Sequence, residues 1–298
     1  MSTDQSVIVW GEVLIDRFPS GPELGGAPAN CAYHLGQAGG WSRLASRVGD
    51  DEDGRWLLDR LAGHVDVELV QIDPERATGE VTVTLDERGD ARYRLVPDRA
   101  WERIACTGAI AEAIGEAGVF VYGTLAQRTA AGLAAWTAAC AAARAGCFRV
   151  CDLNLRPGDG AGPAILPAIE AADLLKVNDA ELAALRDWFG WTDPLEVLRA
   201  RPRIIAVTHG ASGSTLFGPS GANEIPAERA APGGDNVGCG DAFLAVLVHG
   251  MTLGWDLAEC GRAASRWASA VAEVRGATPF FDDERVADLL ELDREDVA

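Results

Sequence analysis

Residues 234–243 read GDNVGCGDAF and lead into the apolar run 242–251, which predicts a glycine-rich turn that opens a helix. Such a turn directs several backbone N–H groups toward one point, where the helix dipole also favours negative charge. An anion cradle is therefore expected from the N–H groups of Gly238, Cys239, Gly240 and Asp241. Asp241 is also a candidate base for an attacking hydroxyl, which favours phosphoryl transfer to an alcohol. The alternative for Asp241 is an ordinary helix-capping residue.

The rest of the chain alternates short β-like runs with amphipathic helical stretches, which predicts an α/β fold with a mostly parallel sheet covered on both faces. Expected strands span residues 7–13, 43–48, 119–122, 149–153, 174–177 and 204–208, and expected helices span 29–37, 52–61, 130–144, 179–188, 241–251 and 256–274. Residues 80–85 and 91–96 instead alternate apolar with polar side chains around a polar turn, which predicts a β-hairpin.

Composition excludes several function classes. The 298 residues carry 45 acidic and 26 basic side chains, a net charge of −19, which argues against nucleic acid or an anionic membrane surface as a partner. No apolar run is long enough to span a bilayer, and the first six residues lack a secretory signal, so we expect a cytoplasmic protein. Seven cysteines without a C-x-x-C pair indicate neither a zinc site nor a disulfide framework.

Residues 235–241, DNVGCGD, resemble the D-T-x-G-A-G-D signature of the ribokinase-like (PfkB) carbohydrate kinases, with Asn236 in place of Thr and Cys239 in place of Ala. The first signature of that family, a glycine doublet followed by Asn, is matched by GGAPAN at 25–30. In motif the chain is closest to bacterial fructokinase-like members. The resemblance implies one three-layer ribokinase-like domain over residues 1–298. It also implies a small β-sheet lid from segments near 12–20 and 78–104, which excludes water from the sugar and is a possible homodimer contact.

The resemblance also implies site residues. Asp241 would be the base, and the sugar would be bound by Asp16, Gly25, Gly26, Asn30, Trp101 and Arg156. ATP would lie against Asn178, Thr208, Gly210 and Gly213. Asn178 and Glu181 match an N-x-x-E motif that organises hydrated Mg²⁺, and Asp235 and Asn236 would hold a monovalent cation such as K⁺. Simpler alternatives are a capping box for Asn178 and Glu181, a turn residue for Asp16, and a structural ion pair for Arg156.

Cys239 carries a separate expectation. A thiol at a helix N-terminus is predicted to have a lowered pKa and to react with alkylating reagents, with ATP protecting it. The alternative is a tolerated small side chain whose backbone N–H is all that the site requires.

The sequence thus predicts an ATP- and Mg²⁺-dependent sugar kinase that phosphorylates a primary hydroxyl, with fructose as the first choice and fructose 6-phosphate as the product. Alternatives are a kinase for 2-keto-3-deoxygluconate, ribose or a nucleoside, and a non-catalytic sugar- or nucleotide-binding member of the fold. An NAD-dependent oxidoreductase is excluded because no G-x-G-x-x-G follows the first expected strand.

Overall fold

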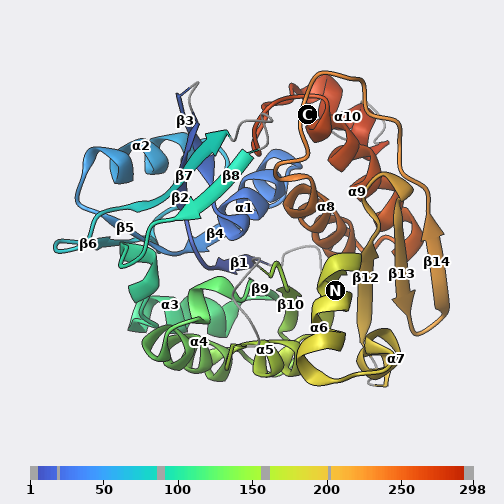
Figure 1. The fold of residues 1–298 in the computed structure, drawn as a ribbon, viewed down its shortest axis with the longest axis horizontal. Coiled ribbons are helices and arrows are strands. Elements are labelled where there is room, and N and C mark those ends of the chain that lie inside the picture. The colour runs from blue at the N-terminus through green and yellow to red at the C-terminus, as the bar shows by residue number, and fades with distance from the viewer. Residues whose placement is uncertain (1–5, 19–20, 86–90, 156–161, 201–202, 292–298) are drawn as a thin grey trace.

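A central eight-stranded sheet organises the molecule (Figure 1). The computed structural model describes residues 6–18, 21–85, 91–155, 162–200 and 203–291. The strand order is β14-β13-β12-β11-β10-β9-β1-β4; the six strands from β12 to β4 are parallel, and β13 and β14 are antiparallel additions. These strands are β1 (Val7–Trp10), β4 (Ser42–Ala45), β9 (Val119–Tyr122), β10 (Phe148–Asp152), β11 (Leu174–Asn178), β12 (Ile204–Thr208), β13 (Ser214–Gly218) and β14 (Gly221–Ile225).

Each central strand contributes to two cores because successive side chains point to opposite faces of a sheet. In β1, Val7 and Val9 enter one apolar cluster, whereas Ile8 and Trp10 enter the other. Strands buried on both faces read as continuous apolar runs, which is why these segments were recognisable from sequence.

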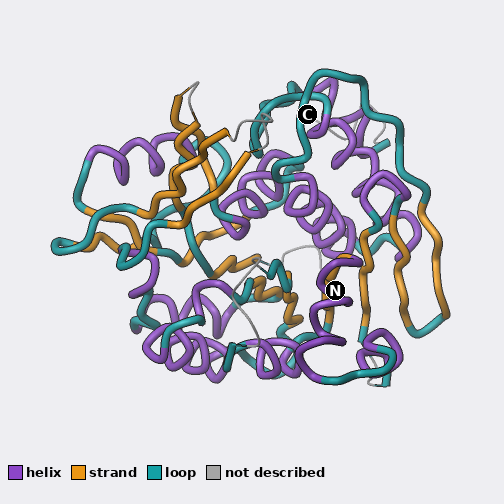
Figure 2. Tube along the Cα trace, viewed as in Figure 1, coloured by secondary structure: helices purple, strands orange, loops and turns teal. Residues whose placement is uncertain are grey.

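Helices cover both faces, as Figure 2 shows. One face packs against α1 (Ala27–Gln37), α2 (Glu52–Leu61), α8 (Cys239–Leu253), α9 (Leu257–Ala272) and α10 (Asp283–Leu290). The other packs against α3 (Gly108–Glu116), α4 (Ala130–Ala142), α5 (Ile165–Ala171), α6 (Asp179–Phe189) and α7 (Pro194–Arg199). Short 3₁₀ turns lie at Ala100–Arg103 (η1), Leu125–Gln127 (η2) and Gly210–Ser212 (η3). Within the described residues, no helix has the length and apolar character needed to cross a membrane.

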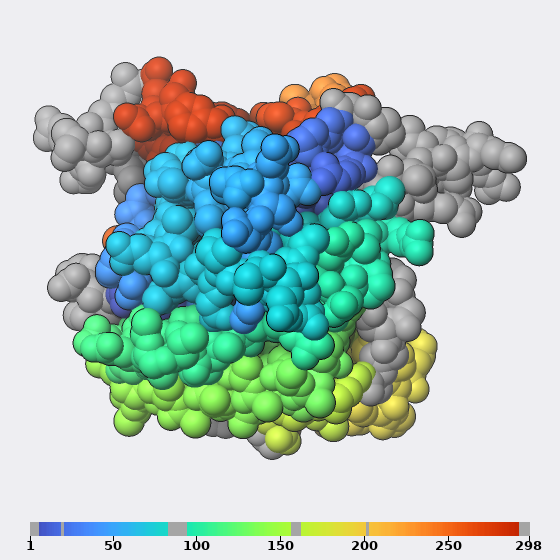
Figure 3. Space-filling model, turned by 90° about the vertical axis from the view of Figure 1, so that its left-hand side faces the viewer, coloured from blue at the N-terminus to red at the C-terminus, as the bar shows by residue number. Residues whose placement is uncertain are grey.

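A second sheet of four strands stands apart from the main one, in the order β3-β2-β7-β8. It comprises β2 (Leu14–Phe18), β3 (Gly21–Gly25), β7 (Gly79–Leu85) and β8 (Ala91–Leu95). The hairpin expected from residues 80–96 is confirmed as the antiparallel pair β7–β8, while its turn at 86–90 lies outside the described residues. Figure 3 shows this side of the molecule, where the blue and cyan segments lie above the green one that contains α3 and α4.

Two of the expected strands are shorter in the structure than predicted from the sequence. The predicted strand 7–13 ends at Trp10, because Gly11, at φ 151°, lets the chain turn away before β2 begins. The predicted strand 43–48 divides into β4 and β5 (Arg47–Gly49), and β5 pairs with β6 (Gln71–Asp73) in a separate two-stranded sheet. The expected helices are found, with ends shifted by one or two residues in most cases.

Candidate active site

The site forms where parallel strands end. Polar residues follow or close four of the parallel strands: Glu12 after β1, Asp152 in β10, Asn178 in β11 and Thr208 in β12. Ligands of open α/β sheets bind beyond this carboxyl edge, because the loops that follow the strands meet there. The edge also faces the N-terminal turns of α1 and α8 (Figure 1).

The glycine turn predicted at 234–243 opens α8. Gly238 is the N-cap residue and has a left-handed φ of 75°, a conformation that favours glycine. A Cβ atom added there would lie 2.7 Å from Ala277, so the turn also requires glycine for space. Asp241 lies in the first turn and is only 9% exposed. The local geometry expected for an anion cradle beside a carboxylate is therefore present.

The two signature motifs meet at one hydrogen bond. Nδ2 of Asn30, in α1, donates to Oδ2 of Asp241 at 2.8 Å, joining residues 211 positions apart. The Oδ1 atom of Asn30 is buried and has no hydrogen-bond partner among the described residues. A buried acceptor of this kind is costly unless a ligand donates to it. Asn30 thus orients the carboxylate of Asp241, and its Oδ1 atom is left as an available acceptor among the described residues.

The same helix holds the loop after α9. Asn30, His34 and Gln37 recur at helical spacing along α1. His34 bonds through Nε2 to the carbonyl of Ala277 at 2.8 Å, and its Nδ1 lies 3.1 Å from Nε1 of Trp267. Because the indole N–H can only donate, Nδ1 accepts and Nε2 carries the proton.

Gln37 completes this row of contacts. Its amide donates to the carbonyl of Pro279 at 3.0 Å and accepts from the N–H of Phe281 at 2.7 Å.

Burial lowers the pKa of His34 to about 4, so its imidazole is neutral near pH 7. His34 and Gln37 had not been singled out in the sequence; their spacing of four and seven residues from Asn30 was the available signal.

A buried ion pair lies at the back of the site. Nζ of Lys176 is 2.8 and 2.9 Å from the two carboxylate oxygens of Asp152, and both residues are buried. Burial alone would lower the pKa of Lys176, but the carboxylates of Asp152, Glu181 and Asp241 together raise it above the ordinary value. Lys176 was also absent from the predicted site. The feature that could have identified Lys176 is the register of the strands, because Asp152 and Lys176 are paired positions on the neighbouring parallel strands β10 and β11.

Asn178 and Glu181 form the capping box that the sequence offered as the simpler alternative. The N–H of Glu181 donates to Oδ1 of Asn178 at 2.9 Å, and the N–H of Asn178 donates to Oε2 of Glu181 at 2.8 Å. The other oxygen of Glu181 accepts from the N–H of Leu155 at 2.8 Å. Burial raises the pKa of Glu181. With both oxygens engaged in this way, Glu181 fits contact with a metal through water better than direct ligation.

Asp235 links two loops. Its carboxylate accepts from the N–H of Val237 at 3.0 Å and from the N–H of Gly276 at 3.3 Å, and so joins the turn before α8 to the loop after α9. Asn236, beside it, is exposed. This is the neighbourhood expected for a monovalent cation, with Asp235 as the anchoring carboxylate.

The predicted nucleotide-binding residues cluster at the end of β12. Thr208 pairs with Asn178 of β11 and with Ser214 of β13. Gly210 and Gly213, at φ 56° and 97°, form the turn between β12 and β13. His209 spans this region, with one ring nitrogen 2.9 Å from Asp179 and the other 3.1 Å from Thr215.

The sugar-side predictions divide into two groups. Asp16 of β2 lies against Gly25 of β3, where an added Cβ would overlap its carboxylate, so these two residues are brought together. Gly26 passes close to the carbonyl of Glu12, where an added Cβ would lie 2.5 Å away. Trp101, by contrast, is completely buried. Arg156 lies outside the described residues.

Trp101 supports the second sheet and offers no surface to a substrate in this conformation. A Cβ atom added to Gly79 of β7 would lie 2.5 Å from the indole ring. The guanidinium of Arg128 covers that ring at 4.8 Å and also pairs with Glu102 at 2.9 Å. Trp101 lies against the second sheet, and its burial leaves the ring no surface for the direct contact with a sugar that the sequence predicted.

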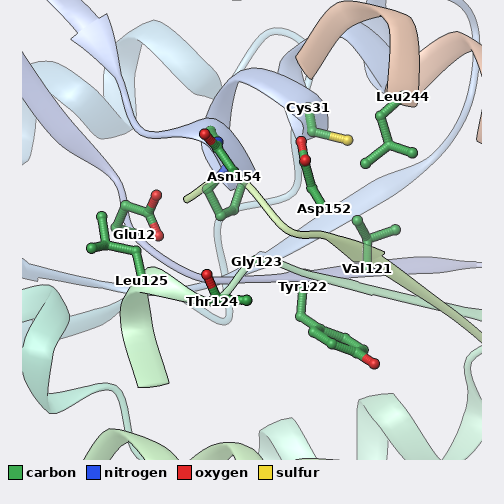
Figure 4. A pocket seen from close by; sticks show the side chains of 12 residues that line it. Glu12, Cys31, Val121, Tyr122, Gly123, Thr124, Leu125, Asp152, Asn154 and Leu244 are labelled. Atoms are coloured by element: carbon green, nitrogen blue, oxygen red, sulfur yellow. The ribbon is translucent and has the colours of Figure 1, made fainter. Parts of the chain in front are cut away.

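A pocket opens between α1 and the ends of β1, β9 and β10. Figure 4 shows Glu12, Asp152 and Asn154 around it, with the ring of Tyr122 pointing away. Asn154 has a left-handed φ of 39°, unusual for a residue other than glycine and characteristic of constrained functional sites. The lining residues are Glu12, Ala27, Pro28, Cys31, Val121, Tyr122, Gly123, Thr124, Leu125, Asp152, Asn154 and Leu244.

The lowered pKa expected for the Cys239 thiol is wrong. Burial, with the nearby carboxylates of Asp235 and Asp241, raises the pKa of the Cys239 thiol from 9.0 to about 11. The helix N-terminus favours a thiolate, but desolvation and two negative neighbours oppose it more strongly here.

The fold and the acid-bearing glycine turn define a phosphotransferase of the α/β sugar-kinase class. Residues 21–284 match the model of the pfkB family carbohydrate kinase, and the chain belongs to that family. The fructokinase of Klebsiella pneumoniae is 28% identical over 301 residues, which cover 92% of this chain and 96% of the relative.

Solved structures share the fold. The fructokinase of Xylella fastidiosa with bound ATP superposes with a TM-score of 0.83 at 21% identity, covering 98% of this chain and 99% of that one. The nucleoside kinase of Burkholderia thailandensis in complex with inosine gives 0.77 at 24% identity, covering 96% of both chains.

Proposed function

We propose that this carbohydrate kinase transfers the γ-phosphoryl group of ATP to a primary hydroxyl of fructose and forms fructose 6-phosphate. The observation that carries the proposal is the 2.8 Å hydrogen bond between Asn30 and Asp241. This bond joins a residue expected to bind the sugar to the residue expected to act as the base. Relatives named fructokinases support the choice of sugar.

Each of these residues has a defined role in the proposed phosphoryl transfer. The acceptor hydroxyl donates its proton to Asp241, and its oxygen attacks the γ-phosphorus in line while the bond from that phosphorus to the bridging oxygen breaks and ADP leaves. The N–H groups of residues 238–241 stabilise charge on the transferred phosphoryl oxygens, at an N-terminal turn where the helix dipole adds to the effect. Asn30 fixes the carboxylate of Asp241 during this step, so the base need not reorient.

The charge of the pocket favours a neutral acceptor. The charged side chains among its lining residues are the acidic Glu12 and Asp152, and Asp152 is paired with Lys176 behind it. Carboxylates accept hydrogen bonds from sugar hydroxyls but repel a sugar phosphate. Arg128, a nearby arginine, is paired with Glu102 and stacked on Trp101, so its charge is already engaged.

The proposed reaction also uses a magnesium ion and a monovalent cation. Asn178 and Glu181 would organise hydrated Mg²⁺, which supplies charge neutralisation for the phosphates of ATP when bound. Asp235, with the backbone around Asn236, would hold a monovalent cation such as K⁺. ATP itself would lie along Thr208, Gly210 and Gly213, beside the cradle.

The second sheet is proposed as a lid over the sugar and as the contact of a homodimer. Its strand β2 is tied to α2, because Arg17 pairs with Asp53, and to β7 within the same sheet, because Arg17 lies 3.1 Å from Glu80. A lid of this kind excludes water and so prevents hydrolysis of ATP.

The test is ATP consumption with a panel of sugars in the presence of Mg²⁺, with and without K⁺. Wild type should turn over fructose, and Asp241→Asn should lose at least about 10²-fold in kcat. A matched control is Asp282→Asn, which removes a capping carboxylate distant from the site and should leave kcat unchanged. A faster reaction with ribose, 2-keto-3-deoxygluconate or a nucleoside would overturn the choice of fructose, and binding without turnover would overturn the kinase assignment of this site.

A further inference from the structure

One buried ammonium group lies at the back of the site. Lys176 is the single lysine of a chain whose other basic side chains, apart from histidine, are arginine. It stands near the end of β11 and is 5% exposed. Burying such a charge is costly unless it is paired, so its position calls for an explanation.

The ammonium group lies between the pocket and the glycine turn. On one side it contacts both oxygens of Asp152, a residue that lines the pocket. On the other side, a Cβ atom added to Gly240 would lie 3.0 Å from Nζ and 3.4 Å from Cε of Lys176. The end of the Lys176 side chain therefore lies directly beside Gly240 of the cradle.

This is an unfavourable place for a cation on its own. The N-terminus of α8 carries the positive end of a helix dipole, which repels an ammonium group and attracts an anion. Asp152 offsets the charge of Lys176 from the pocket side. Two positive features, the helix N-terminus and the ammonium group, nevertheless point at the same space, as they do in phosphate sites.

We propose that Lys176 is a catalytic residue that contacts the transferred phosphoryl group, with Asp152 holding its ammonium group beneath the cradle. The proposal rests on the proposed kinase function and names a member of the site that the family signatures quoted above do not contain.

The chemistry requires no proton transfer from Lys176. Two N–H bonds of the ammonium group are directed to Asp152, and the third is available to an equatorial phosphoryl oxygen. Charge on these oxygens grows in the loose transition state, so a fixed cation stabilises the transition state more than bound ATP. A compact ammonium group also fits the narrow space before Gly240 better than a planar guanidinium would.

A single lysine allows a direct test by NMR. Labelling with ε-¹⁵N-lysine gives one side-chain signal, which is followed while Mg²⁺ and either ADP or β,γ-methylene ATP are added. The expected result is a shift of the signal with the methylene analogue, which carries a γ-phosphoryl group, and a much smaller shift with ADP. Equal responses to the two nucleotides would overturn the proposal. Because no turnover is needed, this result is separable from the sugar panel.

Kinetics provide the second test. Lys176→Met should lower kcat about 10²- to 10³-fold while KM for the sugar and Kd for ADP change less than about 3-fold, because one transition-state contact is lost. The matched control is Arg47→Met, which breaks the ion pair of Arg47 with buried Asp73 at 2.9 Å, far from the glycine turn. That control should lose stability and keep kcat.

A double variant covers the case in which Lys176→Met fails to fold. Asp152→Asn combined with Lys176→Met removes both charges and leaves no unpaired buried ion. Continued loss of kcat in the folded double variant supports the contact with the phosphoryl group. Recovery of kcat toward wild type would overturn it, because Lys176 would then serve only to neutralise Asp152.

Discussion

The pH dependence of alkylation at Cys239 tests the electrostatics of the site quantitatively. With a pKa of about 11 in place of 9.0, the thiolate fraction at pH 7 falls from about 1% to about 0.01%. Since the thiolate is the reacting species, alkylation by iodoacetamide should be about 100-fold slower than at an ordinary thiol, before any steric protection.

The assay is peptide mapping by mass spectrometry after timed exposure to iodoacetamide between pH 6 and 10. The rate at Cys239 should rise about tenfold per pH unit across this whole range, because its pKa lies above it. Cys106 is also half-buried, its pKa is raised by burial alone, and it serves as the internal reference that should react first. A plateau at Cys239 below pH 9, or reaction faster than at Cys106, would refute the reasoning.

Three further predictions follow from the same structure. Asn30→Leu removes a buried hydrogen bond to a carboxylate and should lower kcat/KM about 10- to 100-fold in steady-state assays, whereas an unchanged value would show that the base is oriented by other contacts. Gly238→Ala forces a left-handed residue into a filled space and should lower the free energy of unfolding by at least about 1 to 2 kcal/mol in urea melts, whereas Gly108→Ala, with open space at the start of α3, should be neutral or stabilising. His34 has a folded-state pKa of about 4 against 6.5, so the unfolded chain binds more protons below pH 6.5; stability should fall by up to about 3 kcal/mol as the pH drops from 6.5 to 4, and His34→Gln should flatten that part of the curve.

Local sequence information was sufficient for the main sheet and for the turn at 234–243. Apolar runs such as 119–122 identify strands buried on both faces, and glycine at 238 signals a left-handed turn before a helix. The end of the first strand was harder to predict from the sequence. Apolar residues resume at 13–15 after Gly11 and Glu12, which suggested that the strand continued. The chain leaves the sheet there because Gly11 turns and β2 pairs with β3 and β7, which is decided by tertiary contacts.

Within the site, the residues that sequence reasoning missed act through neighbours distant along the chain. Lys176 meets Asp152 across two strands, and His34 meets a carbonyl more than 240 positions away. The misjudged pKa of Cys239 has a similar origin. A helix N-terminus can be read from sequence, but the burial that opposes it depends on how the whole core packs.

The contacts of α1 have a consequence for folding during synthesis of the protein on the ribosome. Asn30, His34 and Gln37 find their partners in Asp241 and in residues 277–281, more than 200 positions later. At 5–20 residues per second, a ribosome needs roughly 10–40 s to cover that interval. During this time the polar row of α1 has only water to bond with, so the helix cannot settle into its final environment. The candidate active site is therefore completed only late in synthesis, and translation arrest before residue 241 would release a chain that contains most of the sheet but lacks Asp241.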